Sequence, residues 1–117
     1  MKPGLRKEWA GRQNVLLTHP RSRDVPCVLS RRVEVPTGRK TALRFAVTNH
    51  PKGDWTLVVR VDGEEVLKKS VEDTEWQEFR IDLTKYARET INIELENQAS
   101  DWAFEAAYWS RIVIESE

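Results

Sequence analysis

Apolar and polar residues alternate with a period of two along most of this chain, from residue 41 to residue 115. This period places every second side chain on one face of an extended strand, so the pattern predicts half-buried β-strands. Turn sequences such as Pro36-Thr37-Gly38, Pro51-Lys52-Gly53 and Asp62-Gly63 interrupt the alternation at intervals of about 8–14 residues. Short strands at this spacing are typical of an all-β fold, a two-sheet antiparallel β-sandwich.

Each predicted strand has one set of apolar positions that we expect to face the core. These positions are Cys27, Leu29, Val33 and Val35; Leu43, Phe45 and Val47; Trp55, Leu57, Val59 and Val61; Phe79, Ile81 and Leu83; and Ile91, Ile93 and Leu95. Trp109 shares parity with Val113 in the closing strand, so we also expect Trp109 in the core. Residues 82–87 are expected to form a single turn between strands rather than a helix.

The first part of the chain lacks this periodicity. Residues 1–13 contain Pro3, Gly4 and Gly11, and we expect them to form a flexible N-terminal arm or linker in which only Trp9 contacts the body. Residues 14–117 are expected to form one β-sandwich domain, because a chain of this length is too short for two cores. The residues near the start contain no apolar stretch that would indicate a signal peptide. The sequence is nevertheless compatible with a secreted or periplasmic module of a larger protein.

Three segments carry a resemblance to a known fold family: residues 53–63 with their Asp-Gly turn, residues 76–87 with Asp82-Leu83-Thr84, and the late aromatic strand of residues 102–114. Together they resemble a galactose-binding-domain-like jelly roll, similar to carbohydrate-binding or accessory modules of bacterial multidomain proteins. The resemblance implies a jelly-roll sandwich and a binding function. Such domains often hold a structural calcium ion, but no closely spaced Asp-x-Asp cluster is present here, so we predict no metal site.

Charge and composition exclude several function classes. Nineteen basic residues balance nineteen acidic ones, so no net field attracts nucleic acid or an anionic membrane. Residues 1–44 hold eleven of the basic residues and residues 94–117 six of the acidic ones, which we expect to pair within the sandwich. Zinc-ligand spacings and glycine-rich phosphate loops are missing, and a nucleophile with a nearby base is not evident. We therefore predict a protein that is not an enzyme and needs no cofactor.

The strongest candidate for a binding site is a polar loop near the end of the chain. Trp102 follows Asp101 in this loop, with Asn97 and Glu105 nearby in sequence. An indole stacks on the C–H face of a sugar, while carboxylates and amides bond its hydroxyls. Two interpretations stay open: Trp102 is a binding platform, or it covers the end of the sandwich while Glu105 pairs with a basic strand residue.

Two further residues complete the predicted ligand-binding set. Trp76 is out of phase with the apolar positions of its strand, so it faces solvent or is turned inward by a bulge. His19 precedes a proline and is expected to serve the turn, unless the fold brings it beside Trp102. We predict a monomeric, non-catalytic carbohydrate- or glycoconjugate-binding module of a larger protein. The alternative is a protein–protein interaction or structural accessory domain that docks on a neighbouring protein domain.

Overall fold

The computed structural model describes residues 4–22, 24–100 and 105–117. These ranges contain nine strands and one short 3-10 turn: β1 (Gly4–Trp9), β2 (Arg12–Thr18), β3 (Cys27–Glu34), β4 (Thr41–Asn49), β5 (Trp55–Val61), β6 (Glu64–Val71), β7 (Gln77–Asp82), η1 (Thr84–Tyr86), β8 (Thr90–Gln98) and β9 (Ala107–Ser116). No helix in these ranges is long and apolar enough to cross a membrane.

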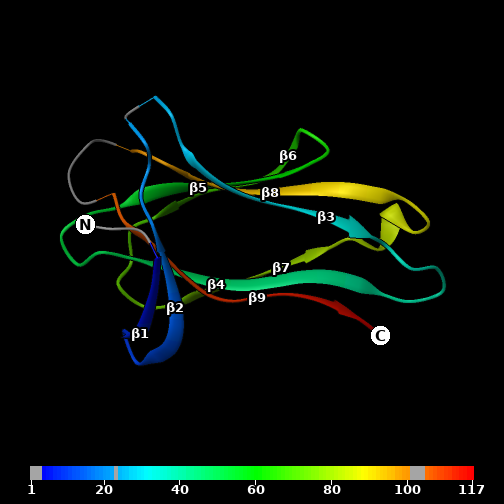
Figure 1. Cartoon of the computed structure of the whole chain (residues 1–117), viewed down its shortest axis with the longest axis horizontal. Coiled ribbons are helices and arrows are strands. Elements are labelled where there is room, and N and C mark those ends of the chain that lie inside the picture. The colour runs from blue at the N-terminus through cyan, green and yellow to red at the C-terminus, as the bar shows by residue number, and fades with distance from the viewer. Residues whose placement is uncertain (1–3, 23, 101–104) are drawn as a thin grey trace.

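The strands form two layers, one above the other in Figure 1. One sheet has the strand order β1-β2-β9-β4-β7, and the other has the order β3-β8-β5-β6. All paired strands run antiparallel. The fold is therefore a two-sheet antiparallel β-sandwich, as the alternating sequence predicts, and it is of the jelly-roll type that the resemblance implies.

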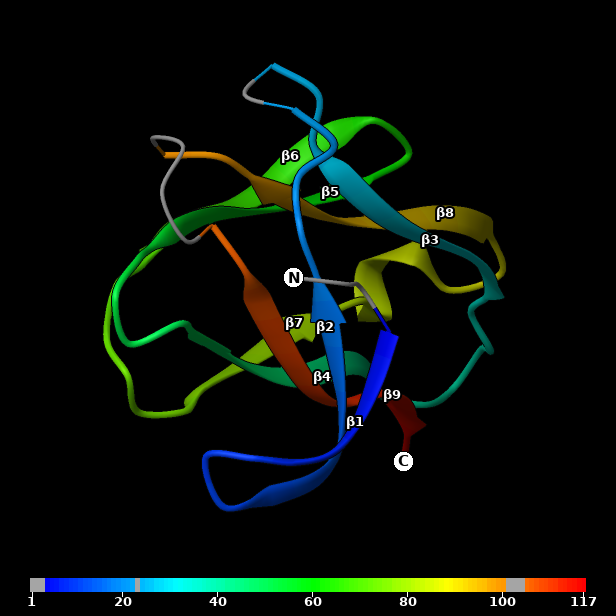
Figure 2. The ribbon, with the colours of Figure 1, turned by 60° about the vertical axis from the view of Figure 1, so that its left-hand side comes forward.

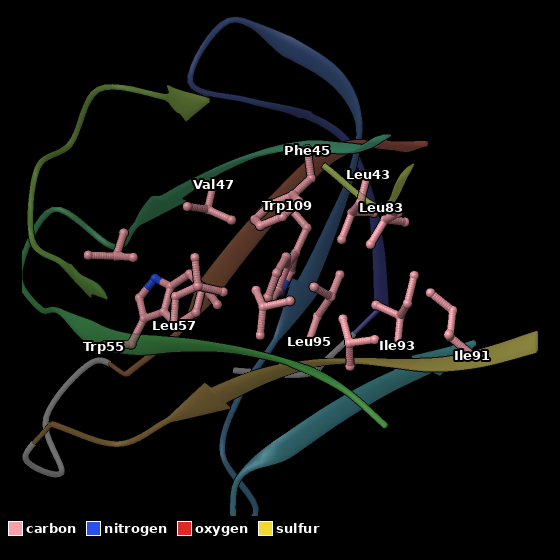
Figure 3. Close-up of a cluster of buried hydrophobic side chains, with 14 of the residues drawn as sticks. Leu43, Phe45, Val47, Trp55, Leu57, Leu83, Ile91, Ile93, Leu95 and Trp109 are labelled. Atoms are coloured by element: carbon pink, nitrogen blue, oxygen red, sulfur yellow. The ribbon is translucent and has the colours of Figure 1, made fainter. Parts of the chain in front are cut away.

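The core lies between the two sheets and uses the predicted positions. Trp55 of β5 and Trp109 of β9 are both fully buried, and their rings meet at 5.1 Å between centroids. Figure 3 shows these two indoles between the aliphatic side chains of both sheets. Trp55 donates its Nε1–H to the backbone oxygen of Thr48 at 3.1 Å, so this buried polar atom has a partner.

The expectation of an arm without regular structure is wrong for residues 4–13. Strands β1 and β2 form a hairpin whose two turn residues, Ala10 and Gly11, have positive φ values of 49° and 82°. Figure 2 shows this hairpin at one edge of the five-stranded sheet, with its turn pointing away from the other sheet. Trp9 stacks on Tyr108 of β9 at 4.0 Å, which confirms that this tryptophan contacts the body. Periodicity does not reveal β1, because an edge strand needs few apolar residues.

A bulge in β9 changes which side chains face the core. Arg44 pairs with Val113 and Ala46 pairs with Ser110, so two residues of β9 lie opposite the single residue Phe45. The alternation therefore shifts after Trp109. Val113, which shares sequence parity with Trp109, is 41% exposed on the outer side of the sheet.

Candidate functional site

Two of the predicted site residues lie inside the protein. Asn97 and Glu105 are both fully buried, and the Asn97 amide donates to the backbone oxygen of Glu105 at 3.3 Å. The Asn97 Oδ1 atom accepts a hydrogen bond from the Thr18 hydroxyl at 3.1 Å, and this hydroxyl accepts the indole N–H of Trp109 at 2.8 Å. The chain of bonds joins β2, β8 and β9, which gives Asn97 a structural role in the described fold.

His19 lies at the same end of the sandwich. Its backbone N–H bonds the Cys27 sulfur, and Cys27 pairs with Asn97 across β3 and β8. Its ring Nδ1 lies 2.9 Å from the backbone oxygen of Pro20, in keeping with the expected turn chemistry. Asp101 and Trp102 lie outside the described residues, so their place in a binding site stays a prediction.

Trp76 lies apart from these residues, on the outer side of the five-stranded sheet. It is half-buried against a cluster that includes Val15, Leu17 and Tyr108. Its indole N–H donates to the backbone oxygen of Ala10 at 2.9 Å, so the tip of the β1–β2 hairpin holds it in place. The ring thus lies on the outer face of the sheet, but it packs on buried residues beneath the hairpin tip and only part of it faces solvent.

Beside Trp76, the outer face of the same sheet forms a hollow of about 220 Å³ that we call the arginine hollow. Side chains from β2, β4, β7 and β9 line it. Its charged lining consists of Arg12, Arg44, Arg80, Arg111, Glu78 and Glu115. The volume is below the range of about 300–1,000 Å³ typical of pockets for drug-sized ligands, so it suits one ring of a longer chain.

Contacts within the lining fix some of these arginines. The guanidinium carbon of Arg12 lies 4.9 Å from the centre of the Trp76 ring, and its Nη1 lies 3.5 Å from the Ser110 hydroxyl. Arg44 forms an ion pair with Glu115 at 3.3 Å. Among the described residues, Arg80 and Arg111 form no ion pair within 4 Å and no hydrogen bond through their side chains. Their donors can therefore meet a ligand.

Beyond the edge of the hollow, Asp82 ends strand β7. The hydroxyl and backbone N–H of Thr84 both bond its carboxylate, and this lowers the pKa of Asp82. Arg80 adds a smaller attraction in the same direction. Asp82 is thus committed to the turn that starts η1, as the sequence predicts for residues 82–87, and does not belong to the ligand-facing lining.

Metal ligands are not gathered in the part of the chain that the structure describes. No group of three or more His, Cys, Asp or Glu side chains there could hold a metal ion. The chemistry of the arginine hollow is hydrogen-bond donation and positive charge, which suits a polar organic ligand.

Parity alone puts Arg44 and Arg80 on solvent-facing positions of their strands, but it does not reveal the hollow. Strand β7 lies beside β4, although the 27 residues from 50 to 76 separate them in sequence. Arg12 reaches the site only because the β1–β2 hairpin folds beside β9. The one local signal is Trp76, an aromatic residue out of phase with its own strand.

No protein-family model matches the sequence, and no curated protein matches it. Among solved structures, a carbohydrate-binding module, CBM36 in complex with calcium and xylotriose, superposes with a TM-score of 0.57. The sequences are 15% identical over 100% of this chain and 93% of that module. The chain shares the jelly-roll fold of that module.

Two further structures are similar at lower scores. A structure described as "CBM4 structure and function" gives a TM-score of 0.47 at 18% identity, over 88% of this chain and 82% of that one. A cycloisomaltooligosaccharide glucanotransferase from Paenibacillus sp., complexed with cycloisomaltoheptaose, gives 0.45 at 16% identity. That match takes in 76% of this chain but spans 12% of the glucanotransferase.

Proposed function

We propose that this protein is a non-catalytic carbohydrate-binding module whose ligand lies across the arginine hollow. The observation that carries the proposal is the exposed donor set on the outer sheet face, where Arg80 and Arg111 offer guanidinium groups without ion-pair partners among the described residues. A guanidinium presents five N–H donors in a fixed plane, and adjacent sugar hydroxyls accept such pairs well. The nearby carboxylates of Glu78 and Glu115 can accept hydrogen bonds from other hydroxyls.

The shape and fold support the same function. The hollow lies on an open sheet face, so a polymer can cross it without threading a closed cavity. The solved CBM36 module of the same fold holds xylotriose, which makes a saccharide the first ligand class to test. The arginines of the lining suit binding rather than proton transfer, because a guanidinium stays protonated at accessible pH and cannot act as a general acid or base.

One feature of the edge strand favours a monomer. The outermost strand β6 of the four-stranded sheet carries Lys68 and Lys69, and lysines on an edge strand discourage pairing with another copy. A module of this kind supplies binding for a catalytic neighbour. The protein–protein alternative would instead require an apolar docking face, whereas the hollow is lined mainly by charged groups.

The test is a screen of the purified protein against an array of neutral and acidic polysaccharides, followed by titration calorimetry on the best ligand. We expect Arg44→Ala/Arg80→Ala to abolish binding, and the matched pair Arg31→Ala/Arg32→Ala on β3 to keep it. Absence of any glycan binding would disprove the function. Loss of binding in Trp102→Ala, with the Arg44/Arg80 variant unaffected, would keep the function and move the site to the end loop.

A further inference from the structure

The arginine hollow is a local concentration of positive charge in a chain with no net charge. Four arginines and two glutamates line it, so positive side chains exceed negative ones by two. The ion pair between Arg44 and Glu115 is half exposed on both sides and neutralises only one of the four arginines directly. A charged lining of this kind attracts an anion more strongly than a neutral sugar.

The pairing of β4 with β7 places two of these charges together. Arg44 and Arg80 are direct partners in the register, so their Cβ atoms lie on the same face at a separation of about 4.5–5.5 Å. Like charges directly opposite each other destabilise a sheet. A carboxylate between the two guanidinium groups would turn this repulsion into two favourable contacts.

A third arginine reaches the hollow through an unfavourable backbone conformation. Arg111 has φ of 54°, in the left-handed region that glycine adopts without strain. It lies in the bulge of β9, and bulges redirect side chains near binding sites. Glycine would relieve this strain but would remove the guanidinium from the hollow.

We propose that the arginine hollow recognises a saccharide that carries carboxylate groups, that is, a uronate unit within a glycan. This inference rests on the carbohydrate-binding function proposed above. The planar fork of arginine matches a carboxylate with two parallel hydrogen bonds, which a hydroxyl pair matches less strongly. Arg44, Arg80 and Arg111 approach from three adjacent strands, and Arg12 is positioned at the margin by its stacking on Trp76.

The first experiment compares polysaccharides that differ only in charge. Polygalacturonate is titrated beside its fully methyl-esterified form, and dextran sulfate is titrated beside dextran. We expect polygalacturonate to bind and its methyl ester to bind at least about tenfold more weakly, because each charge-assisted pair is lost. Raising the NaCl concentration should weaken the polygalacturonate complex. Equal or tighter binding of dextran sulfate would show that the site selects anions in general, and would overturn the carboxylate assignment.

The second experiment locates the contact. Arg80→Gln and Arg111→Gln should each weaken polygalacturonate binding by roughly tenfold or more, while Arg32→Gln on β3 leaves it unchanged. An equal loss in Arg32→Gln would reduce the interaction to unspecific charge attraction and overturn the inference. Binding of neutral glycans alone would also overturn it while keeping the proposed function. Absence of binding to any glycan would disprove both this inference and the proposed carbohydrate-binding function.

Discussion

Arg44 of β4 and Arg80 of β7 are direct cross-strand partners, so two positive side chains share one spot on the outer face of the five-stranded sheet. A sheet selected only for stability would place an acidic or neutral residue at one of these positions. Glu115 pairs with Arg44 from the opposite strand β9, but no described residue forms an ion pair with Arg80. The arrangement therefore leaves the donors of Arg80 without an ion-pair partner among the described residues.

The first prediction concerns this repulsion. Arg80→Gln should stabilise the free protein by about 0.2–1 kcal/mol, because one of two facing like charges is removed. Urea denaturation at low ionic strength measures the effect, and added salt should reduce it. Arg32→Gln, an exposed arginine on the other sheet, is the matched control. A lower stability of Arg80→Gln would show that Arg80 has a structural role instead.

The second prediction concerns Arg60, whose place on the polar side of its strand suggests that its removal costs little. The structure changes this expectation, because Arg60 Nε donates to Glu96 Oε2 at 2.6 Å and the Glu96 side chain is only 8% exposed. Arg60→Ala leaves a buried carboxylate without its cation. We expect a clearly lower denaturation midpoint than for Arg32→Ala. Much of the loss should vanish in the double variant Arg60→Ala/Glu96→Gln, and a full, additive loss there would contradict the coupling.

The third prediction tests the buried bonds at the end of the sandwich. Thr18→Val keeps the shape of the side chain but removes the acceptor for Trp109 and the donor to Asn97. We expect a loss of about 1–3 kcal/mol, because buried polar atoms lose their partners. Tryptophan fluorescence during urea unfolding reports it, with the exposed loop variant Thr37→Val as control. Equal stability of the two variants would disprove the role of this chain of bonds.

The fourth prediction concerns Cys27, which the sequence suggests is a buried, inert thiol. The residue is half-buried, and burial raises the pKa of its thiol, which the backbone N–H of His19 only partly offsets. The reactive thiolate should therefore form at higher pH than in an unfolded peptide of residues 24–30. Alkylation rates measured from pH 7 to pH 10 check this. A midpoint at or below that of the peptide would contradict it.

The sequence alone determined the architecture, and local rules explain why. Alternation identified the strands that build the core, since a residue's parity reports its face of the sheet. The Asp62-Gly63 turn joins β5 and β6 with positive φ at both residues, as that dipeptide predicts. Trp55 and Trp109 are in the core on the same grounds.

The predicted binding residues show what the pattern within one strand cannot predict. Asn97 and Glu105 occur in a polar segment, yet the fold buries both: β8 lies between β3 and β5, and the Asn97 side chain bonds Thr18 and the backbone oxygen of Glu105. The bulge at Arg111 reverses the parity of β9, so Val113 moves from the expected core to the surface. A bulge arises from the fit between neighbouring strands, and nothing in the pattern of one strand specifies it.

Only the tertiary structure decided where the candidate site lies. The arginine hollow takes its side chains from β2, β4, β7 and β9, which are distant in sequence and adjacent only through the strand order. Sequence patterning fixes which way Arg44 and Arg80 point, because that depends on the strand that carries each. Their closeness depends on which strands pair, and strand pairing follows from the packing of the whole sandwich.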